Sequence, residues 1–321
     1  MGIDSFMTTI TIRTFTQEDI PQVMRIQQVY RQAYPNATVI PGEVYLSPGF
    51  EGGKNIFCAF NEHDILLGYA PIYPNLATEP DIPHTIWVEV KASPEITEPR
   101  KIKDSLFEKI VQRAKEIGQS APGHPIHLTF QYHPSEIASI EYVQSRGCAY
   151  MESVFRMICD LTQGIKILPP PALLDVRRWR MESEAEQLSY VEARNEAFPE
   201  APVALADWQA FLASPAWQDG TTITAFEGQA VVGSVTAYMD ETISQITGKR
   251  AGYTEYIFVR KNWQKRGIAS YLINQAQLYL KERGGEAAFL EVRASNQNAL
   301  ELYRKLGYHE VDESRLYTLE V

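Results

Sequence analysis

A short basic turn in the last third of the sequence is suited to holding an anion. Residues 259–269 read as a strand end, a turn and a helix start, and the turn contains Lys265, Arg266 and Gly267. Backbone N–H groups at a helix N-terminus lack intrahelical partners, and the helix dipole adds partial positive charge. Such an end binds phosphate, and glycine lets the phosphate approach the backbone closely. Taken alone, the pattern equally fits a capped helix behind a solvated basic turn.

A second segment adds weight to the first. Residues 290–308 read as a strand, a helix that begins after Asn296, and a closing Gly-Tyr pair. Together the two segments resemble the GNAT superfamily of N-acetyltransferases, whose acetyl-CoA signature is Gln or Arg, two residues, Gly, one residue, and Gly or Ala. Three residues match this signature: Gln264, Gly267 and Ala269. The second segment is similar to the family's closing strand, helix and Gly-Tyr.

The resemblance implies where acetyl-CoA, the co-substrate of the family, would bind. In the family, two central strands separate, and one of them holds the pantetheine arm through its backbone. The corresponding residues here are Ile257, Phe258 and Val259 for the arm, and Gln264, Lys265, Arg266, Gly267, Ile268, Ala269 and Ser270 for the pyrophosphate. Asn296 is expected to bind the cofactor, to cap its helix, or to do both.

The resemblance also implies an acid and a base. Transfer of an acetyl group to an amine needs a base for the amine proton and an acid for the leaving thiolate. Tyr303 stands at the family's usual tyrosine position and would be the acid, while Glu255 stands where several members carry a glutamate base. A backbone N–H would stabilise the oxyanion. The alternatives are a core role for Tyr303 beside Leu302 and Leu306, and a solvated or ion-paired Glu255.

The order of predicted elements repeats along the chain. Each half reads as a strand (residues 9–15 in the first), a helix, a hairpin, a central strand, a long helix and a closing strand, helix and strand. Prolines separate the halves. We therefore predict a degenerate GNAT-like domain at 1–165, a linker at 166–171 and an acetyl-CoA-binding GNAT domain at 172–321. The expected fold class is α/β (α+β), with two tandem GNAT-like mixed-sheet domains, a layout similar to that of mycothiol synthase.

The first half is predicted to have lost cofactor binding. Its turn at residues 90–101 has no glycine before the helix and contains glutamates instead. Aligning the ends of the central strands places Ile86 opposite Glu255, and aligning the glycines after the last helices places Val143 opposite Tyr303. Both the acid and the base are therefore expected to be missing, and this half is expected to support the active one.

Composition excludes several classes of protein. A net charge of −10 argues against extended contacts with nucleic acid or an anionic membrane. No apolar stretch is long enough to span a bilayer. The three cysteines are widely spaced, which predicts reduced thiols in a cytoplasmic protein. The histidines lack the spacing of a metal-binding motif, so no metal is expected.

The most favoured function is acetyl transfer from acetyl-CoA to the amine of a small molecule, by direct attack in a ternary complex. Residues 192–217 mix aromatic and acidic side chains, which would suit a small cationic amine, although the aromatic residues equally fit a core. Two alternatives stay open. One is a non-catalytic acyl-CoA-binding sensor or scaffold, and the other is a protein or peptide N-acetyltransferase.

Overall fold

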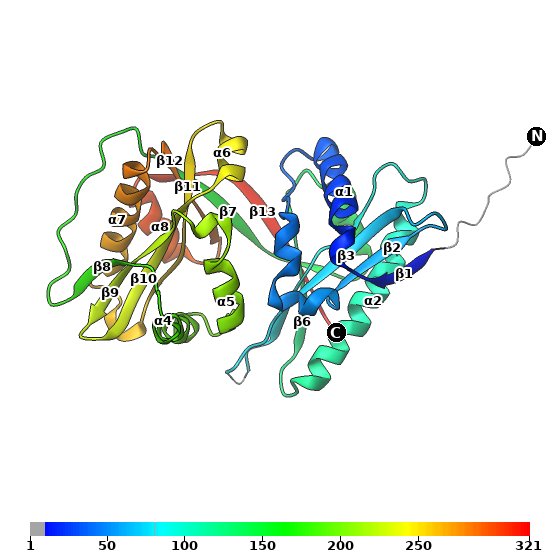
Figure 1. Ribbon diagram of the computed structural model, residues 1–321, viewed down its shortest axis with the longest axis horizontal. Coiled ribbons are helices and arrows are strands. Elements are labelled where there is room, and N and C mark those ends of the chain that lie inside the picture. Colours follow the sequence, from blue (N-terminus) through cyan, green and yellow to red (C-terminus); the bar gives the residue numbers. More distant parts are fainter. Residues whose placement is uncertain (1–9, 80) are drawn as a thin grey trace, which may run out of the picture. The chain divides into compact units, whose positions relative to one another are not determined.

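The computed structural model describes residues 10–79 and 81–321 and contains two compact units of mixed α/β structure (Figure 1). Unit 1 consists of the described residues up to Met151 together with Arg315–Val321, and unit 2 is Glu152–Ser314. Among the described helices, none combines the length and the apolar character that crossing a membrane requires.

Unit 1 follows the predicted order of elements: β1 (Thr11–Thr14), α1 (Ile20–Ala33), β2 (Ile56–Phe60), β3 (Leu66–Asn75), β4 (His84–Val88), β5 (Lys91–Ala92), α2 (Pro99–Ser120), β6 (Ile126–Tyr132) and α3 (Ile137–Ser145). Position 9 of the predicted first strand lies outside the described residues. Side chains alternate across β2, so that Cys58 packs with the α1 core and Ala59 with the α2 core. The sheet therefore has a helix layer on each face.

Unit 2 repeats this plan: β8 (Asp175–Trp179), α4 (Glu184–Ala197), α5 (Leu205–Leu212), β9 (Thr221–Glu227), β10 (Ala230–Met239), α6 (Glu241–Thr247), β11 (Ala251–Val259), α7 (Ile268–Glu282), β12 (Ala287–Arg293) and α8 (Gln297–Lys305). The strand order is β7-β12-β11-β10-β9-β8, where β7 is Ala149–Asp160. Helices α7 and α8 share one core with the sheet, and α4 and α5 share another on the opposite face. A capping box between Ser183 and Glu186 starts α4.

Two long strands are divided between the units. In β7 (Ala149–Asp160), the residues from Glu152 onward belong to unit 2 and pair antiparallel with β12. In β13 (Tyr308–Glu320), the residues from Arg315 onward belong to unit 1 and pair antiparallel with β6. The final strand of each sequence half therefore completes the sheet of the other half's unit. The predicted linker at 166–171 lies in irregular backbone between β7 and β8, and a domain boundary there stays a prediction.

One glycine in each unit is required by a close approach between strands. Gly68 pairs with Ala92, and a Cβ added to Gly68 would lie 2.7 Å from the carbonyl oxygen of Lys91. Gly233 pairs with Val259, and a Cβ there would lie 2.7 Å from the carbonyl oxygen of Phe258. These glycines mark the same register position in both sheets, because neither position has room for a side chain.

The end of β13 that belongs to unit 1, from Arg315 onward, should be essential to the stability of that unit. Tyr317 is 3% exposed and packs in the α2 core. Tyr317→Ala should therefore cost about 3–5 kcal/mol of stability, as truncations of large buried side chains do. Hydrogen exchange should then accelerate in β6 but not in β9 and β10. Glu320→Ala, an exposed change on the same strand, is the control, and equal acceleration in β9 and β10 would contradict the assignment of this strand to unit 1.

Candidate active site

Strand β11 separates from β12 partway along its length. The parallel pairing of the two strands ends at Tyr253 and Phe289, and no later pair joins them among the described residues. Just beyond this point the register of β11 against β10 shifts, and Tyr256 takes a φ of +48°. A bulge of this kind adds an unpaired residue and bends its strand. The backbone of residues 254–259 is therefore left without a β12 ladder on that side.

The three residues predicted to line this gap lie at the end of β11 that does not pair with β12. Ile257 and Val259 pack against the core of α7 and α8, whereas Phe258 is 4% exposed in the core of α4 and α5. Their side chains are thus committed to the two faces of the sheet. What remains for a ligand between the strands is the backbone, as the predicted pantetheine contact requires.

The loop after β11 brings the predicted anion-binding residues together at the start of α7. Gly267 is the N-cap of α7 and has a φ of +74°, and Lys265 has a φ of +61°. Gln264 donates its side-chain amide to the Val259 carbonyl at 3.0 Å, which ties the loop to β11. A Cβ added to Gly267 would meet nothing within 4 Å. The helix N-terminus is therefore open to solvent beside two cationic side chains.

Glu255 lies on β11 immediately before the bulge, and the hydroxyl of Tyr238 on β10 donates to its carboxylate at 2.9 Å. Burial raises the pKa of Glu255 to about 7, against the opposing effect of the Tyr238 hydrogen bond. A carboxyl group with this pKa exchanges protons near neutral pH, as a general base requires.

Tyr303 on α8 is 7% exposed and packs in the core of α7 and α8, with its ring 6.0 Å from that of Tyr308. The structure thus confirms its core packing. No hydrogen bond to its hydroxyl is found within the described chain, and burial raises its pKa to about 12. The phenol is therefore protonated throughout the neutral range and keeps a proton to donate. Core packing and a role as an acid are compatible.

Asn296 caps α8, because its side-chain oxygen accepts from the backbone N–H of Ala299 at 3.2 Å. One of the two predicted roles is confirmed, and contact with a cofactor stays a prediction.

The aromatic residues predicted for an acceptor site divide into two groups. Trp208 and Trp217 are 1% and 4% exposed and belong to the core, as the alternative held. Phe211 is partly exposed and lies 5.6 Å from Tyr238 and 6.1 Å from Tyr256, measured between ring centroids. Tyr238 and Tyr256 were not predicted, because each stands in an apolar or aromatic run that reads as core. Of the two, Tyr238 contacts Glu255 through its hydroxyl.

The corresponding strand of unit 1 corrects one expectation. Ile86 does not occupy the position of Glu255. Thr236, three residues after Gly233, faces Glu255, and Pro71, three residues after Gly68, accepts the backbone N–H of Glu89 at 3.3 Å. Unit 1 therefore has a glutamate at this position. The expected alignment was wrong because it matched Val259 with Val90, whereas Ala92 is the residue paired with the equivalent glycine, two positions later. The bulge, which adds one residue to β11, accounts for the third position.

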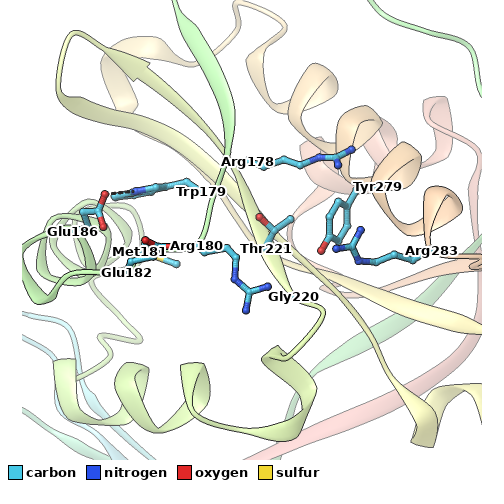
Figure 2. Close-up of a pocket in the computed structure, with 10 residues that line it drawn as sticks. All are labelled: Arg178, Trp179, Arg180, Met181, Glu182, Glu186, Gly220, Thr221, Tyr279 and Arg283. Atoms are coloured by element: carbon cyan, nitrogen blue, oxygen red, sulfur yellow. Dashed lines mark hydrogen bonds between the residues drawn. The ribbon is translucent and has the colours of Figure 1, made fainter.

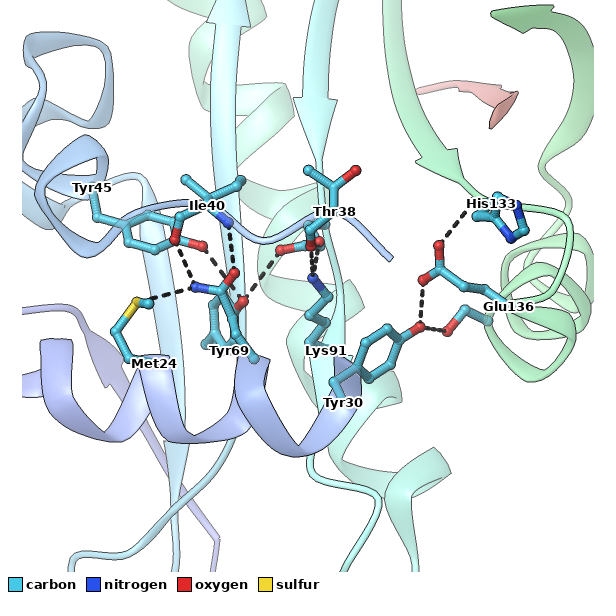
Figure 3. Close-up of polar contacts among 12 residues, drawn as sticks. Met24, Tyr30, Thr38, Ile40, Tyr45, Tyr69, Lys91, His133 and Glu136 are labelled. Carbon is cyan, nitrogen blue, oxygen red and sulfur yellow. Dashed lines mark hydrogen bonds and ion pairs between the residues drawn. The ribbon is translucent and has the colours of Figure 1, made fainter. Parts of the chain in front are cut away.

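A buried network of charged and phenolic groups surrounds this glutamate (Figure 3). Lys91 is 1% exposed, lies 2.5 Å from the Glu89 carboxylate and donates to the Thr38 carbonyl. The hydroxyl of Tyr30, on α1, donates to the Glu136 carboxylate at 2.7 Å. Lys91 is the unit 1 equivalent of Phe258, because each residue directly precedes the residue that pairs with Gly68 or Gly233. Where unit 2 has an apolar strand end and an open loop, unit 1 has an ion pair.

Among the described residues, no group of three or more His, Cys, Asp or Glu side chains is arranged to hold a metal ion.

Comparisons with known proteins agree with the geometry of unit 2. A model of the acetyltransferase (GNAT) family matches residues 179–308. An uncharacterised N-acetyltransferase of Methanocaldococcus jannaschii is 38% identical over 68 residues, which are 21% of this chain and 30% of that protein. The N-alpha-acetyltransferase MAK3 of Arabidopsis thaliana is 41% identical over 66 residues, 21% of this chain and 34% of the relative. The chain thus spans about a third of the length of these curated relatives.

Solved structures extend the likeness in fold to the whole chain. A tandem GNAT protein from the clavulanic acid biosynthesis pathway has a TM-score of 0.68 at 12% identity and covers 97% of this chain and 98% of its own. A GCN5-related N-acetyltransferase from Sphaerobacter thermophilus has a TM-score of 0.64 at 19% identity, and the match covers 97% of this chain and 95% of that chain. Both units therefore have the fold of a tandem GNAT protein, and residues 179–308 are a domain of the GNAT acetyltransferase family.

Proposed function

We propose that the chain transfers an acetyl group from acetyl-CoA to the amine of a small molecule, with unit 2 holding both substrates and unit 1 supporting it. The observation that carries this proposal is the separation of β11 from β12, which ends at an open helix N-terminus. Acetyl-CoA would lie with its pantetheine arm along residues 257–259 and its pyrophosphate at residues 264–270. It supplies an activated thioester.

Glu255 and Tyr303 then have complementary tasks. The Glu255 carboxylate accepts a proton from the acceptor's ammonium group, and the neutral amine attacks the thioester carbonyl. A carbon–nitrogen bond forms and the carbon–sulfur bond breaks. Tyr303 donates its proton to the sulfur, and the second proton that the attacking nitrogen loses in becoming a neutral amide returns to Tyr303, directly or through solvent. A backbone N–H at the unpaired end of β11 stabilises the oxyanion, and no covalent enzyme intermediate is needed.

The surroundings of Glu255 support a small cationic acceptor. Tyr238, whose hydroxyl binds the carboxylate, packs its ring against that of Phe211, and ring faces attract an ammonium group. A second candidate is acetylation of protein N-termini, which the name of the Arabidopsis relative favours. The two differ in acceptor, so a panel of small amines beside N-terminal peptides separates them. Binding of acetyl-CoA without transfer to any acceptor would favour a sensor or scaffold.

Binding of acetyl-CoA should depend on Gly267. Gly267→Val puts a branched side chain into the space proposed for the pyrophosphate and should weaken acetyl-CoA binding at least about tenfold. Gly228→Val is a matched control, because Gly228 also has a positive φ and faces open space. Calorimetric titration should show one site per wild-type chain, retained in the Gly228 variant. Two sites would contradict a silent unit 1, and none would overturn the proposed binding.

Tyr303→Phe should lower kcat about 100-fold or more while the Kd of acetyl-CoA stays unchanged, because only the donated proton is removed. Tyr308→Phe is the control, since Tyr308 is a buried tyrosine in the same core whose hydroxyl bonds to Thr254. This control should lose some stability and keep its turnover. Normal kcat in Tyr303→Phe would exclude Tyr303 as the acid.

Glu255 should impose a pH dependence on both activity and stability. With a pKa of about 7, the base is lost as pH falls through 7, so kcat/KM should rise through this pH and level off. Because the folded pKa exceeds the unfolded value, the folded state holds the proton more tightly. The free energy of unfolding should therefore fall as pH rises from about 4.5 to 7. Glu255→Gln should abolish both effects.

Glu301→Gln, an exposed change on α8, is the control for this titration. Persistence of the transition near pH 7 in Glu255→Gln would show that another group titrates.

A further inference from the structure

Unit 2 contains a cavity lined by β8, the start of β9, the approach to α4 and the C-terminal end of α7 (Figure 2). Its volume is about 450 Å³. The proposed pyrophosphate loop lies at the other end of α7, and Ile268 and Arg283 are about 22 Å apart along that helix at 1.5 Å per residue. The cavity is therefore separate from the proposed acetyl-CoA site.

Three arginines line the cavity, and two of them, Arg180 and Arg283, are held in place by backbone carbonyls or an aromatic ring. Arg180 donates to the backbone carbonyls of Trp217 and Gln218 at 3.2 and 3.1 Å, and Arg283 donates through Nε to that of Asp219 at 3.2 Å. The Arg283 guanidinium also lies 3.9 Å from the centre of the Tyr279 ring. These contacts position the guanidinium groups before any ligand binds.

The charges of Arg180 and Arg283 are not neutralised by ion pairs. Arg178 is paired with Glu282 at 2.5 Å, but no carboxylate within 4 Å of Arg180 or Arg283 is found among the described residues. Of the two glutamates that line the cavity, Glu186 is bound by the Trp179 indole at 3.0 Å and by the Ser183 backbone. Only the Nε of Arg283 donates a hydrogen bond to a carbonyl, so both of its terminal nitrogens are free to bind an anion.

We propose that this cavity binds the phosphate group of a small molecule, with Arg180 and Arg283 as its ligands. Guanidinium groups match phosphate oxygens in pairs, and two fixed guanidinium groups suit a doubly charged group better than a single carboxylate. The site does not depend on acetyl-CoA binding and would serve as a separate subsite or effector site.

The first experiment titrates inorganic phosphate and phenyl phosphate at fixed ionic strength into the full chain saturated with acetyl-CoA, which fills the proposed pyrophosphate site. Both should bind at one further site, and Arg180→Gln with Arg283→Gln should weaken this binding about tenfold or more. Lys265→Gln with Arg266→Gln removes the same charge from the pyrophosphate loop and should leave the affinity within about twofold. Tighter binding of phenyl phosphate assigns an organic phosphate, and tighter binding of inorganic phosphate assigns the free ion. Loss of binding in the loop variant instead would overturn the proposal.

A measurement on the wild type covers the case in which the double variant loosens the turn at 217–219. Phenylglyoxal modifies accessible arginines, and peptide mass spectrometry reads each one separately. Phosphate should slow modification of Arg180 and Arg283 severalfold and leave Arg177 unchanged, since Arg177 is on the same strand but outside the cavity. Equal protection of all three, or none, would refute the site.

Discussion

The proposed site of unit 2 depends on where the ladder between its two central parallel strands ends. The β11–β12 ladder ends at Tyr253 and Phe289, and in unit 1 the β4–β6 ladder ends at the equivalent pair, Trp87 and Thr129. The bulge at Tyr256, which unit 1 lacks, places four steps of chain between Glu255 and Val259, where unit 1 has three between Glu89 and Ala92. The backbone of β11 beyond Tyr253 is the surface on which the proposed acetyl-CoA site rests.

The close pairing of β10 with β11 makes this possible. Gly233 lets the end of β11 lie against β10 without a side chain between them, so the loop to α7 leaves the sheet from a fixed point. Gln264 ties the loop back to Val259, and Gly267 turns it into the helix through a left-handed conformation. The position of the helix N-terminus thus follows from strand geometry, and the exposed N–H groups are a consequence of it.

The two units treat a glutamate at the same register position in opposite ways. In unit 1, Glu89 has a buried lysine 2.5 Å away, and the pair fills the strand end with compensated charge. In unit 2, Glu255 accepts from a tyrosine hydroxyl, and burial raises its pKa to about 7. A carboxyl group with a pKa near neutrality can accept and release a proton.

The sequence alone determined the order of elements, the two-unit architecture and the turn proposed to bind an anion, because these follow from local periodicity and from spacings within a few residues of one another. Glu255 and Tyr303 could be named only through family resemblance. The tertiary structure decided what depends on pairing between distant strands: the end of the β11–β12 ladder, the exchange of β7 and β13, the contact of Tyr238 with Glu255, and the place of Glu89. A one-residue bulge changes which side chains face each other without changing the hydrophobic pattern, so no pattern along the chain could reveal it.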